Sequence, residues 1–217
     1  MADGVHAGNI MANRNRVGAS VASQRFGGEG LSGTGPKAGG PHYLARFTDT
    51  PVGRVAADWG TSMDPATLAA ALQAADAAPV VRQSQVLPGP TGELNKLTTL
   101  PRPPLICAGP GSEAAAAQHA GVVALGGRAV CLDGALQPGA LRHLPPFGGL
   151  IWWGDAATAQ AYAEALSTLE GPIIPLICGH PDTAHACFER HLCVDTTAAG
   201  GNAGLLAGED VARAKVA

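Results

Sequence analysis

Cysteine and histidine side chains, which bind zinc readily, gather in one stretch near the carboxyl end of the chain. The stretch contains Cys178, His180, His185, Cys187, His191 and Cys193. Its spacing matches no common zinc motif. A strand that contains Cys178, followed by a helix that starts at residues 181–182 and contains Cys187, would also turn the side chains apart. We therefore predict no metal site here and expect surface histidines at a loop.

A second candidate site is the turn formed by Gly109, Pro110 and Gly111. It follows an apolar run and opens a helical pattern, which is the context of a phosphate-binding turn. Ala114 stands in place of the third glycine of GxGxxG, and Pro110 lacks a backbone N–H donor. Asp133 is the candidate for the acidic residue that would bind a ribose. A lone GxGxxA is a weak signal, so nucleotide binding remains open as an alternative.

The elements that would position these residues alternate between strand and helix. Short apolar runs predict strands at residues 105–108, 129–132, 150–153, 173–178 and 192–195. The best helical patterns between them lie at residues 112–125 and 155–169. This alternation predicts an α/β fold, a Rossmann-like domain whose parallel sheet is covered on both faces. The adjacent Trp152 and Trp153 would then pack into opposite helix layers.

The residues before this domain fall into two zones. Residues 1–48 are polar and rich in glycine, so they cannot build a core of their own. Residues 49–104 are predicted to be a linker with one helix, at residues 66–77, for which Asp64 is the N-cap. Dense turn signals from residue 80 onward favour extended structure.

Composition argues against several classes of function. The formal net charge is -3 and no long run of lysine or arginine occurs, so we expect no nucleic-acid partner. No stretch approaches the roughly 18 apolar residues of a membrane span, and we expect no signal peptide. The five cysteines lack the spacing of a disulfide framework. We therefore expect buried, reduced thiols and a cytoplasmic protein.

The most specific signal is the sequence of residues 13–41, NRNRVGASVASQRFGGEGLSGTGPKAGGP. Its FGGEGLSGTGPKAGGP portion resembles the carboxy-terminal glycine-rich signature of aldehyde dehydrogenases. The combination of NRN, GA, QxFGG and KAGGP resembles the branch that oxidises glutamate γ-semialdehyde. LPGPTGE at residues 87–93 and TTAAGGNA at residues 196–203 are similar to motifs of the longer proline utilization A family, in the same order. The chain thus resembles a carboxy-terminal remnant of that family.

The resemblance implies a substrate-binding role for Gly18, Ala19 and Phe26. In the family, a Gly–Ala pair on a tight turn holds the substrate carboxylate through backbone N–H groups, which suits an anion. Phe26 matches an aromatic residue that packs on the aliphatic part of the substrate. A ring that only fills the space under the glycine-rich loop is the alternative. Arg25 replaces a proline usual in the family, which would loosen this loop.

The resemblance also implies which groups the chain lacks. In the family, the nucleophilic cysteine, the glutamate base and the dinucleotide fold lie before the glycine-rich signature. We therefore expect no catalytic residue, no cofactor-binding residue and no metal ligand here. The intact family oxidises proline to glutamate with FAD and NAD. We expect the isolated chain to be inactive, and whether it is an enzyme stays open.

The resemblance gives the tail a role in assembly. In the family, the segment that matches residues 196–203 is a β-flap that reaches a neighbouring subunit of a homo-oligomer. The expected partner is the rest of the proline utilization A body or another subunit. A non-catalytic module that docks on a separate dehydrogenase body is the alternative function. The chain is predicted to consist of four parts. Residues 1–48 end an aldehyde dehydrogenase domain, and residues 49–104 form a linker. Residues 105–195 form the Rossmann-like domain, and residues 196–217 form the flap and its tail.

Overall fold

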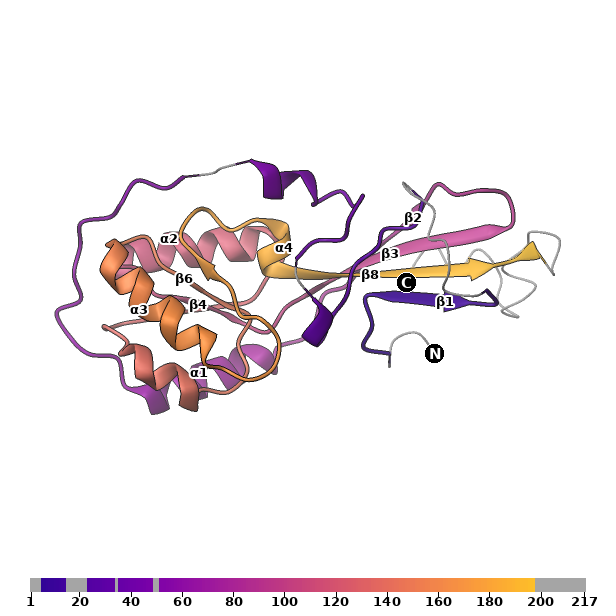
Figure 1. Cartoon of the computed structure of the whole chain (residues 1–217). Helices are drawn as coiled ribbons and strands as arrows, with labels where there is room; N and C mark the ends of the chain where they lie inside the picture. The colour runs from indigo at the N-terminus through magenta and orange to yellow at the C-terminus, as the bar shows by residue number, and fades with distance from the viewer. Residues whose placement is uncertain (1–4, 15–22, 34, 49–50, 198–217) are drawn as a thin grey trace. The chain divides into compact units, whose positions relative to one another are not determined.

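The chain forms two compact units. The computed structural model describes residues 5–14, 23–33, 35–48 and 51–197. Unit 1 takes its described residues from 1–43, 82–99 and 189–217, and unit 2 consists of 44–81 and 100–188. Each unit contains strands of one four-stranded sheet (Figure 1). The segment predicted as a linker therefore contributes to both units.

Unit 2 contains a parallel sheet with the strand order β5-β4-β6-β7. Every neighbouring pair is parallel, and the strands are β4 (Leu105–Cys107), β5 (Ala129–Cys131), β6 (Gly149–Ile151) and β7 (Leu176–Ile177). All residues of β4 and β6 are buried, as expected for central strands covered on both faces. A mixed α/β fold with a parallel sheet is confirmed.

Helices cover both faces of this sheet (Figure 1). They are α1 (Pro65–Asp76), α2 (Gly111–Ala124), α3 (Ala156–Ser167) and the short α4 (Thr183–Ala186), with 3-10 turns η3 (Leu44–Phe47) and η4 (Pro138–His143). Side chains of α1 and α3 pack with Ile106 and Leu150, whereas those of α2 pack with Leu105 and Ile151. Trp152 and Trp153 lie in these two separate clusters, as predicted. None of the described helices is long and apolar enough to cross a membrane.

The turn between β4 and α2 is held by one buried amide side chain. Gln118 is fully buried on α2. Its Nε2 donates to the Gly109 carbonyl at 2.8 Å, and its Oε1 accepts from the Gly109 N–H at 3.0 Å. A buried backbone group without a partner is costly, so Gln118 stabilises the turn by satisfying both groups.

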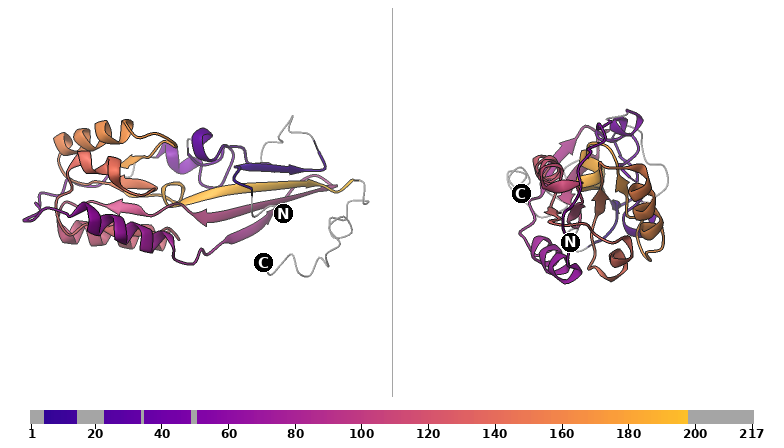
Figure 2. Two further views of the ribbon diagram at one scale, coloured as in Figure 1. Left: turned by 90° about the horizontal axis from the view of Figure 1, so that it is seen from below. Right: turned by 90° about the vertical axis from the view of Figure 1, so that its left-hand side faces the viewer.

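Unit 1 contains a mixed sheet with the order β1-β8-β3-β2. Its strands are β1 (Asn9–Ala12), β2 (Gln83–Leu87), β3 (Glu93–Pro101) and β8 (Cys187–Asp195), and a 3-10 turn, η2, spans Gly30–Ser32. β1 is parallel to β8, and β2 and β3 are antiparallel. Gly92 has a φ of 89° in the loop between β2 and β3, a conformation that favours glycine. Figure 2 shows β3 and β8 side by side.

Three predictions about the carboxyl half are wrong. Residues 192–195 do not add a strand to the parallel sheet, because they belong to β8, whose buried face carries Glu189 and His191. The helix expected around Cys187 ends at Ala186, so Cys187 opens the strand. The thiols of Cys131 and Cys178 are exposed rather than buried. A short apolar run does not reveal the polar alternation on either side of it.

His191, which was expected at the surface, is instead fully buried on β8. Within the part of the chain that the structure describes, neither of its ring nitrogens has a hydrogen-bond partner. Burial, together with the charges of Lys37 and Arg25, lowers its pKa to about 4. The neutral ring is therefore the form compatible with the folded unit.

We predict that Gln118→Ala destabilises unit 2 by about 2–3 kcal/mol, because the Gly109 N–H is left buried and unpaired. Urea unfolding followed by tryptophan fluorescence measures this, since Trp59, Trp152 and Trp153 all lie in unit 2. Gln160→Ala, at an exposed position of α3, is the control and should change stability by less than about 0.5 kcal/mol. Equal effects of the two substitutions would contradict this role.

We predict that His191 makes unit 1 sensitive to acid. Its pKa in the folded chain, about 4, is below that of an unfolded chain, so stability is lost as pH falls from about 6.5 towards 4. Relative to His191→Leu, the native chain should lose about 2–3 kcal/mol more between pH 7 and about pH 4.5. Denaturant unfolding followed by circular dichroism measures the difference. The exposed His143→Leu variant should keep the native pH dependence.

Candidate functional site

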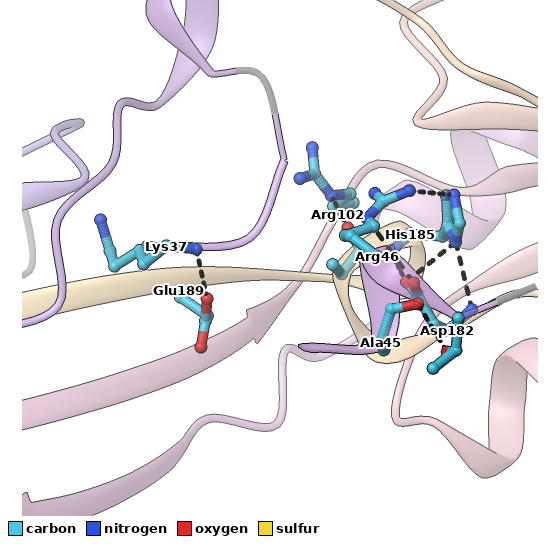
Figure 3. A network of polar contacts seen from close by, with 9 residues as sticks. Lys37, Ala45, Arg46, Arg102, Asp182, His185 and Glu189 are labelled. Atoms are coloured by element: carbon cyan, nitrogen blue, oxygen red, sulfur yellow. Dashed lines mark hydrogen bonds and ion pairs between the residues drawn. The ribbon is translucent and has the colours of Figure 1, made fainter. Parts of the chain in front are cut away.

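The glycine-rich segment of residues 23–40 is attached to the unit 1 sheet by Lys37. The side chain of Lys37 is almost wholly buried, and its Nζ donates to Asn9 Oδ1 at 3.0 Å and to the Gly27 carbonyl at 2.7 Å. Its backbone N–H donates to Glu189 Oε2 on β8 at 2.9 Å (Figure 3). Burial lowers the pKa of Lys37 to about 8. We call Asn9, Lys37 and Glu189 the Lys37 clasp.

Glycines allow the segment to approach its neighbours closely. A Cβ atom at Gly8 would lie 2.0 Å from the Gly27 carbonyl oxygen. One at Gly28 would lie 2.3 Å from the Ser32 carbonyl oxygen. Both distances are far below van der Waals contact, so these positions require glycine for packing.

A carboxylate on β3 joins two other segments. Glu93 forms an ion pair with Arg14 and accepts a hydrogen bond from Gln24 Nε2 at 2.8 Å. Gln24 Nε2 also lies 3.4 Å from Cys193 Sγ, and Arg14 Nη1 lies 3.6 Å from the same atom. We call Arg14, Gln24, Glu93 and Cys193 the Glu93 cluster. The NRN, QxFGG and LPGPTGE motifs therefore meet at one point of unit 1.

The start of TTAAGGNA lies against the same loop. The Thr196 N–H donates to the Gly92 carbonyl at 2.7 Å. A Cβ at Gly92 would lie 3.0 Å from Thr197 Oγ1. The described part of this motif therefore packs close to another backbone, at the loop that carries LPGPTGE. Residues 198–203 of the motif lie outside the described residues.

Only one of the three predicted substrate-binding residues lies among the described residues. Gly18 and Ala19 fall outside them. Phe26 pairs with Ala38 through two backbone hydrogen bonds, of 3.3 and 2.8 Å, and its side chain is 58% exposed. The ring therefore does not fill the space under the glycine-rich segment in this chain. The side-chain Nε and Nη1 of the neighbouring Arg25 are buried and have no partner among the described residues.

Sequence reasoning missed Lys37, Glu93 and Glu189 as positioning residues. Lys37 and Glu93 stand inside motifs that were recognised, but a charged residue in a polar, glycine-rich segment normally faces solvent. Glu189 had one available signal, because Glu189, His191 and Cys193 alternate along β8 and share its buried face.

Three of the side chains considered as metal ligands, those of His180, His185 and Cys187, contact other groups. His180 packs edge-on against Trp153 with ring centroids 5.4 Å apart. His185 accepts from the Asp182 N–H at 3.1 Å and also contacts Arg46 (Figure 3). The Cys187 thiol points to the Leu125 carbonyl at 3.5 Å. Within the described ranges, no three His, Cys, Asp or Glu side chains form a group that could hold a metal ion.

Two of the three residues in the Gly109–Gly111 turn have no free N–H for a phosphate. Gln118 uses the Gly109 N–H, and Pro110 has none. A Cβ at Gly109 would lie 3.1 Å from the Trp59 ring, and one at Gly111 would lie 3.2 Å from Ala57. Trp59 and Ala57 of the chain itself thus lie next to Gly109 and Gly111.

The cysteine side chains are not activated as nucleophiles. Burial raises the pKa of the Cys107, Cys187 and Cys193 thiols, and partial desolvation raises that of the more exposed Cys131 and Cys178. In the Glu93 cluster, Arg14 lowers the pKa of Cys193, but burial outweighs it. Covalent catalysis by cysteine requires a lowered pKa, so the geometry supports binding and positioning rather than attack.

Comparison with known proteins agrees with the motifs. The chain is 35% identical to the "Bifunctional protein PutA" of Salmonella typhimurium over an alignment of 252 residues. This alignment covers 93% of the chain and 19% of the relative. It is 58% identical over 40 residues to the "1-pyrroline-5-carboxylate dehydrogenase" of Bacillus thuringiensis, covering 18% of the chain and 8% of the relative. No protein-family model matches.

A solved PutA structure from Corynebacterium freiburgense aligns with the chain at 23% identity and a TM-score of 0.45. The alignment covers 87% of the chain and 20% of the solved protein. That likeness is too low to carry an argument. The chain spans about a fifth of the length of the PutA relatives it matches. On the sequence matches, the chain is a PutA-related region that resembles aldehyde dehydrogenases.

Proposed function

We propose that the chain serves as the carboxy-terminal part of a PutA-type proline-catabolic protein and supports its glutamate γ-semialdehyde dehydrogenase step. The match to PutA over 93% of the chain carries this proposal. The 40 residues at 58% identity to a pyrroline-5-carboxylate dehydrogenase support the aldehyde dehydrogenase step. In such a protein, FAD serves the oxidation of proline and NAD that of the semialdehyde, and both bind outside this chain.

The role of the chain in that step is to hold the substrate-binding segment in place. In this proposal, Gly18 and Ala19 bind the substrate carboxylate through backbone N–H groups, and Phe26 packs on its aliphatic part. The Lys37 clasp and the Glu93 cluster support it, because they attach both ends of the segment that carries these residues to the unit 1 sheet. The exposed ring of Phe26 is free to contact a substrate.

The proposal also includes the organisation of the chain. Residues 1–48 end an aldehyde dehydrogenase domain, 49–104 link it to the domain of residues 105–195, and 196–217 form a flap and tail. The flap contacts the rest of the protein or another subunit of a homo-oligomer in the cytoplasm. The packing of Thr196 against the Gly92 carbonyl supports a flap that starts at this point.

An alternative function is that of a non-catalytic module that docks on a separate dehydrogenase body. Exposed apolar side chains of the glycine-rich segment favour it. Phe26 is 58% exposed and Leu31 is 81% exposed. Large apolar side chains that are exposed to solvent on one segment indicate a surface that a partner covers.

We predict that the purified chain, incubated with NAD and glutamate γ-semialdehyde, forms no NADH. The reason is that its thiols all have raised pKa values, and that the Gly109 N–H in the Gly109–Gly111 turn is already bonded to Gln118. Absorbance of NADH measures this, with an intact PutA-type enzyme as the positive control. Turnover by the chain alone would refute the prediction.

We predict that the chain restores semialdehyde oxidation to a PutA-type enzyme truncated before the position that matches Gly8. Glu93→Gln should lower the restored rate about tenfold or more, because the neutral amide loses the ion pair with Arg14. Glu170→Gln is the matched control at an exposed position of unit 2 and should restore the full rate. If neither the activity nor the stability of the truncated enzyme changes on mixing, docking is wrong.

A further inference from the structure

Two cysteines lie side by side at the carboxyl end of the unit 2 sheet. Cys107 ends β4 and Cys131 ends β5, and the two residues are register partners across these parallel strands. Neighbouring strands of a sheet lie about 4.8 Å apart, and the Cα atoms of disulfide-bonded cysteines are separated by about 4.4–6.8 Å. The backbone of the sheet therefore holds this pair at a distance that a disulfide can span.

The side chains of the pair lie on the same face of the sheet. Register partners on neighbouring strands share a face, because side chains alternate along both strands in step. Cys107 packs in the apolar cluster that includes Ala115 of α2, and the Cys131 thiol donates to the Ala115 carbonyl at 3.4 Å. Both thiols are therefore next to the same residue of the covering helix.

The two thiols differ in their access to solvent. Cys107 is fully buried, whereas Cys131 is exposed on β5, an edge strand of the sheet. A reagent in solution can therefore reach Cys131, and Cys107 can react with Cys131 once that sulfur carries a leaving group. An accessible cysteine beside a second, resolving cysteine is the arrangement of redox-sensitive thiol pairs.

The other exposed cysteine cannot take part in this pair. Cys178 directly follows β7, which is the opposite edge strand of the sheet. Both β4 and β6 lie between β7 and β5. Cys178 is therefore an accessible thiol of the same unit without a neighbouring cysteine on the next strand, and it serves as an internal control.

We propose that Cys107 and Cys131 form a redox site, at which a small-molecule disulfide such as oxidised glutathione converts the two thiols into an intramolecular disulfide. The Cys131 thiolate attacks one sulfur of the reagent, so a mixed disulfide forms and one small thiolate leaves. The Cys107 sulfur then attacks Cys131 Sγ, which releases the second small thiolate, and the Cys107 proton passes to that thiolate. The two protein thiols are oxidised and the reagent is reduced to two small thiols. This site lies within unit 2 and does not depend on the proposed dehydrogenase function.

The environment of the pair makes this exchange slow at neutral pH. Desolvation raises the pKa of both thiols; in addition, Cys131 raises the pKa of Cys107, whereas Cys107 lowers that of Cys131. Because only the thiolate attacks, the first step becomes faster as pH rises. The second step joins two groups that the sheet already holds together, and this proximity offsets the low thiolate population of Cys107.

Oxidation of the full chain followed by peptide mass spectrometry tests the proposal. The chain is treated with excess oxidised glutathione at about pH 8.5, its remaining thiols are blocked with N-ethylmaleimide in denaturant, and it is digested without reduction. Trypsin cleaves after Arg128, so Cys107 and Cys131 fall in different peptides. These two peptides should be recovered linked, and dithiothreitol should separate them. Absence of the linked pair overturns the proposal, and so does a link through Cys178 or between two chains in its place.

Single substitutions separate the two steps of the exchange. In Cys107→Ala, glutathione should accumulate on Cys131 as a mixed disulfide, because the resolving thiol is missing. In Cys131→Ala, Cys107 should carry no glutathione, since it is buried. Cys178→Ala is the matched control and should form the linked pair as the native chain does, and circular dichroism should show that all three variants fold. Equal amounts of glutathione on Cys131 in the native chain and in Cys107→Ala would contradict a resolving role for Cys107.

Discussion

The carboxylate of Glu93 is the interaction on which unit 1 depends. It lies on β3 and receives Arg14 from the segment after β1 and Gln24 from the glycine-rich segment. Both of these side chains also reach Cys193 on β8. Because the carboxylate is mostly removed from solvent, its charge requires these donors, and each donor in turn fixes a different part of the chain. The recognised motifs, far apart in the sequence, are neighbours for this reason.

Different kinds of interaction stabilise each of the two units. Unit 2 has an apolar core on each face of its parallel sheet, and burial of that surface stabilises it. Unit 1 instead buries polar groups such as Lys37, Glu189 and His191 along one face of its sheet. The Glu189 carboxylate accepts from the Lys37 backbone N–H, whereas His191 has no hydrogen-bond partner among the described residues. Polar burial of this kind specifies a geometry more than it contributes stability.

Local sequence patterns were enough to predict most of the secondary structure of unit 2. The strands β4, β5 and β6 and the helices α1, α2 and α3 begin and end within one or two residues of their predicted bounds. Apolar runs, helix formers and the Asp64 cap act over a few residues, so they can be recognised without tertiary contacts. β8 was only partly foreseen because its buried face carries charged residues, and the pattern that marks a strand assumes apolar ones. The exposure of Cys131 and Cys178 likewise depends on packing around them.

The amino-acid sequence determined the family relationship, the positions of the family's motifs and the α/β character of unit 2. Each of these features can be recognised from residues that follow one another in the chain. Tertiary structure alone decided that Arg14, Glu93 and Cys193 meet, because their contact closes loops of many residues and no local rule encodes such a closure. Tertiary structure also decided which groups contact the Gly109–Gly111 turn after β4. The turn has the sequence context of a phosphate site, but Gln118 accepts the Gly109 N–H and the chain's own Trp59 packs beside this glycine.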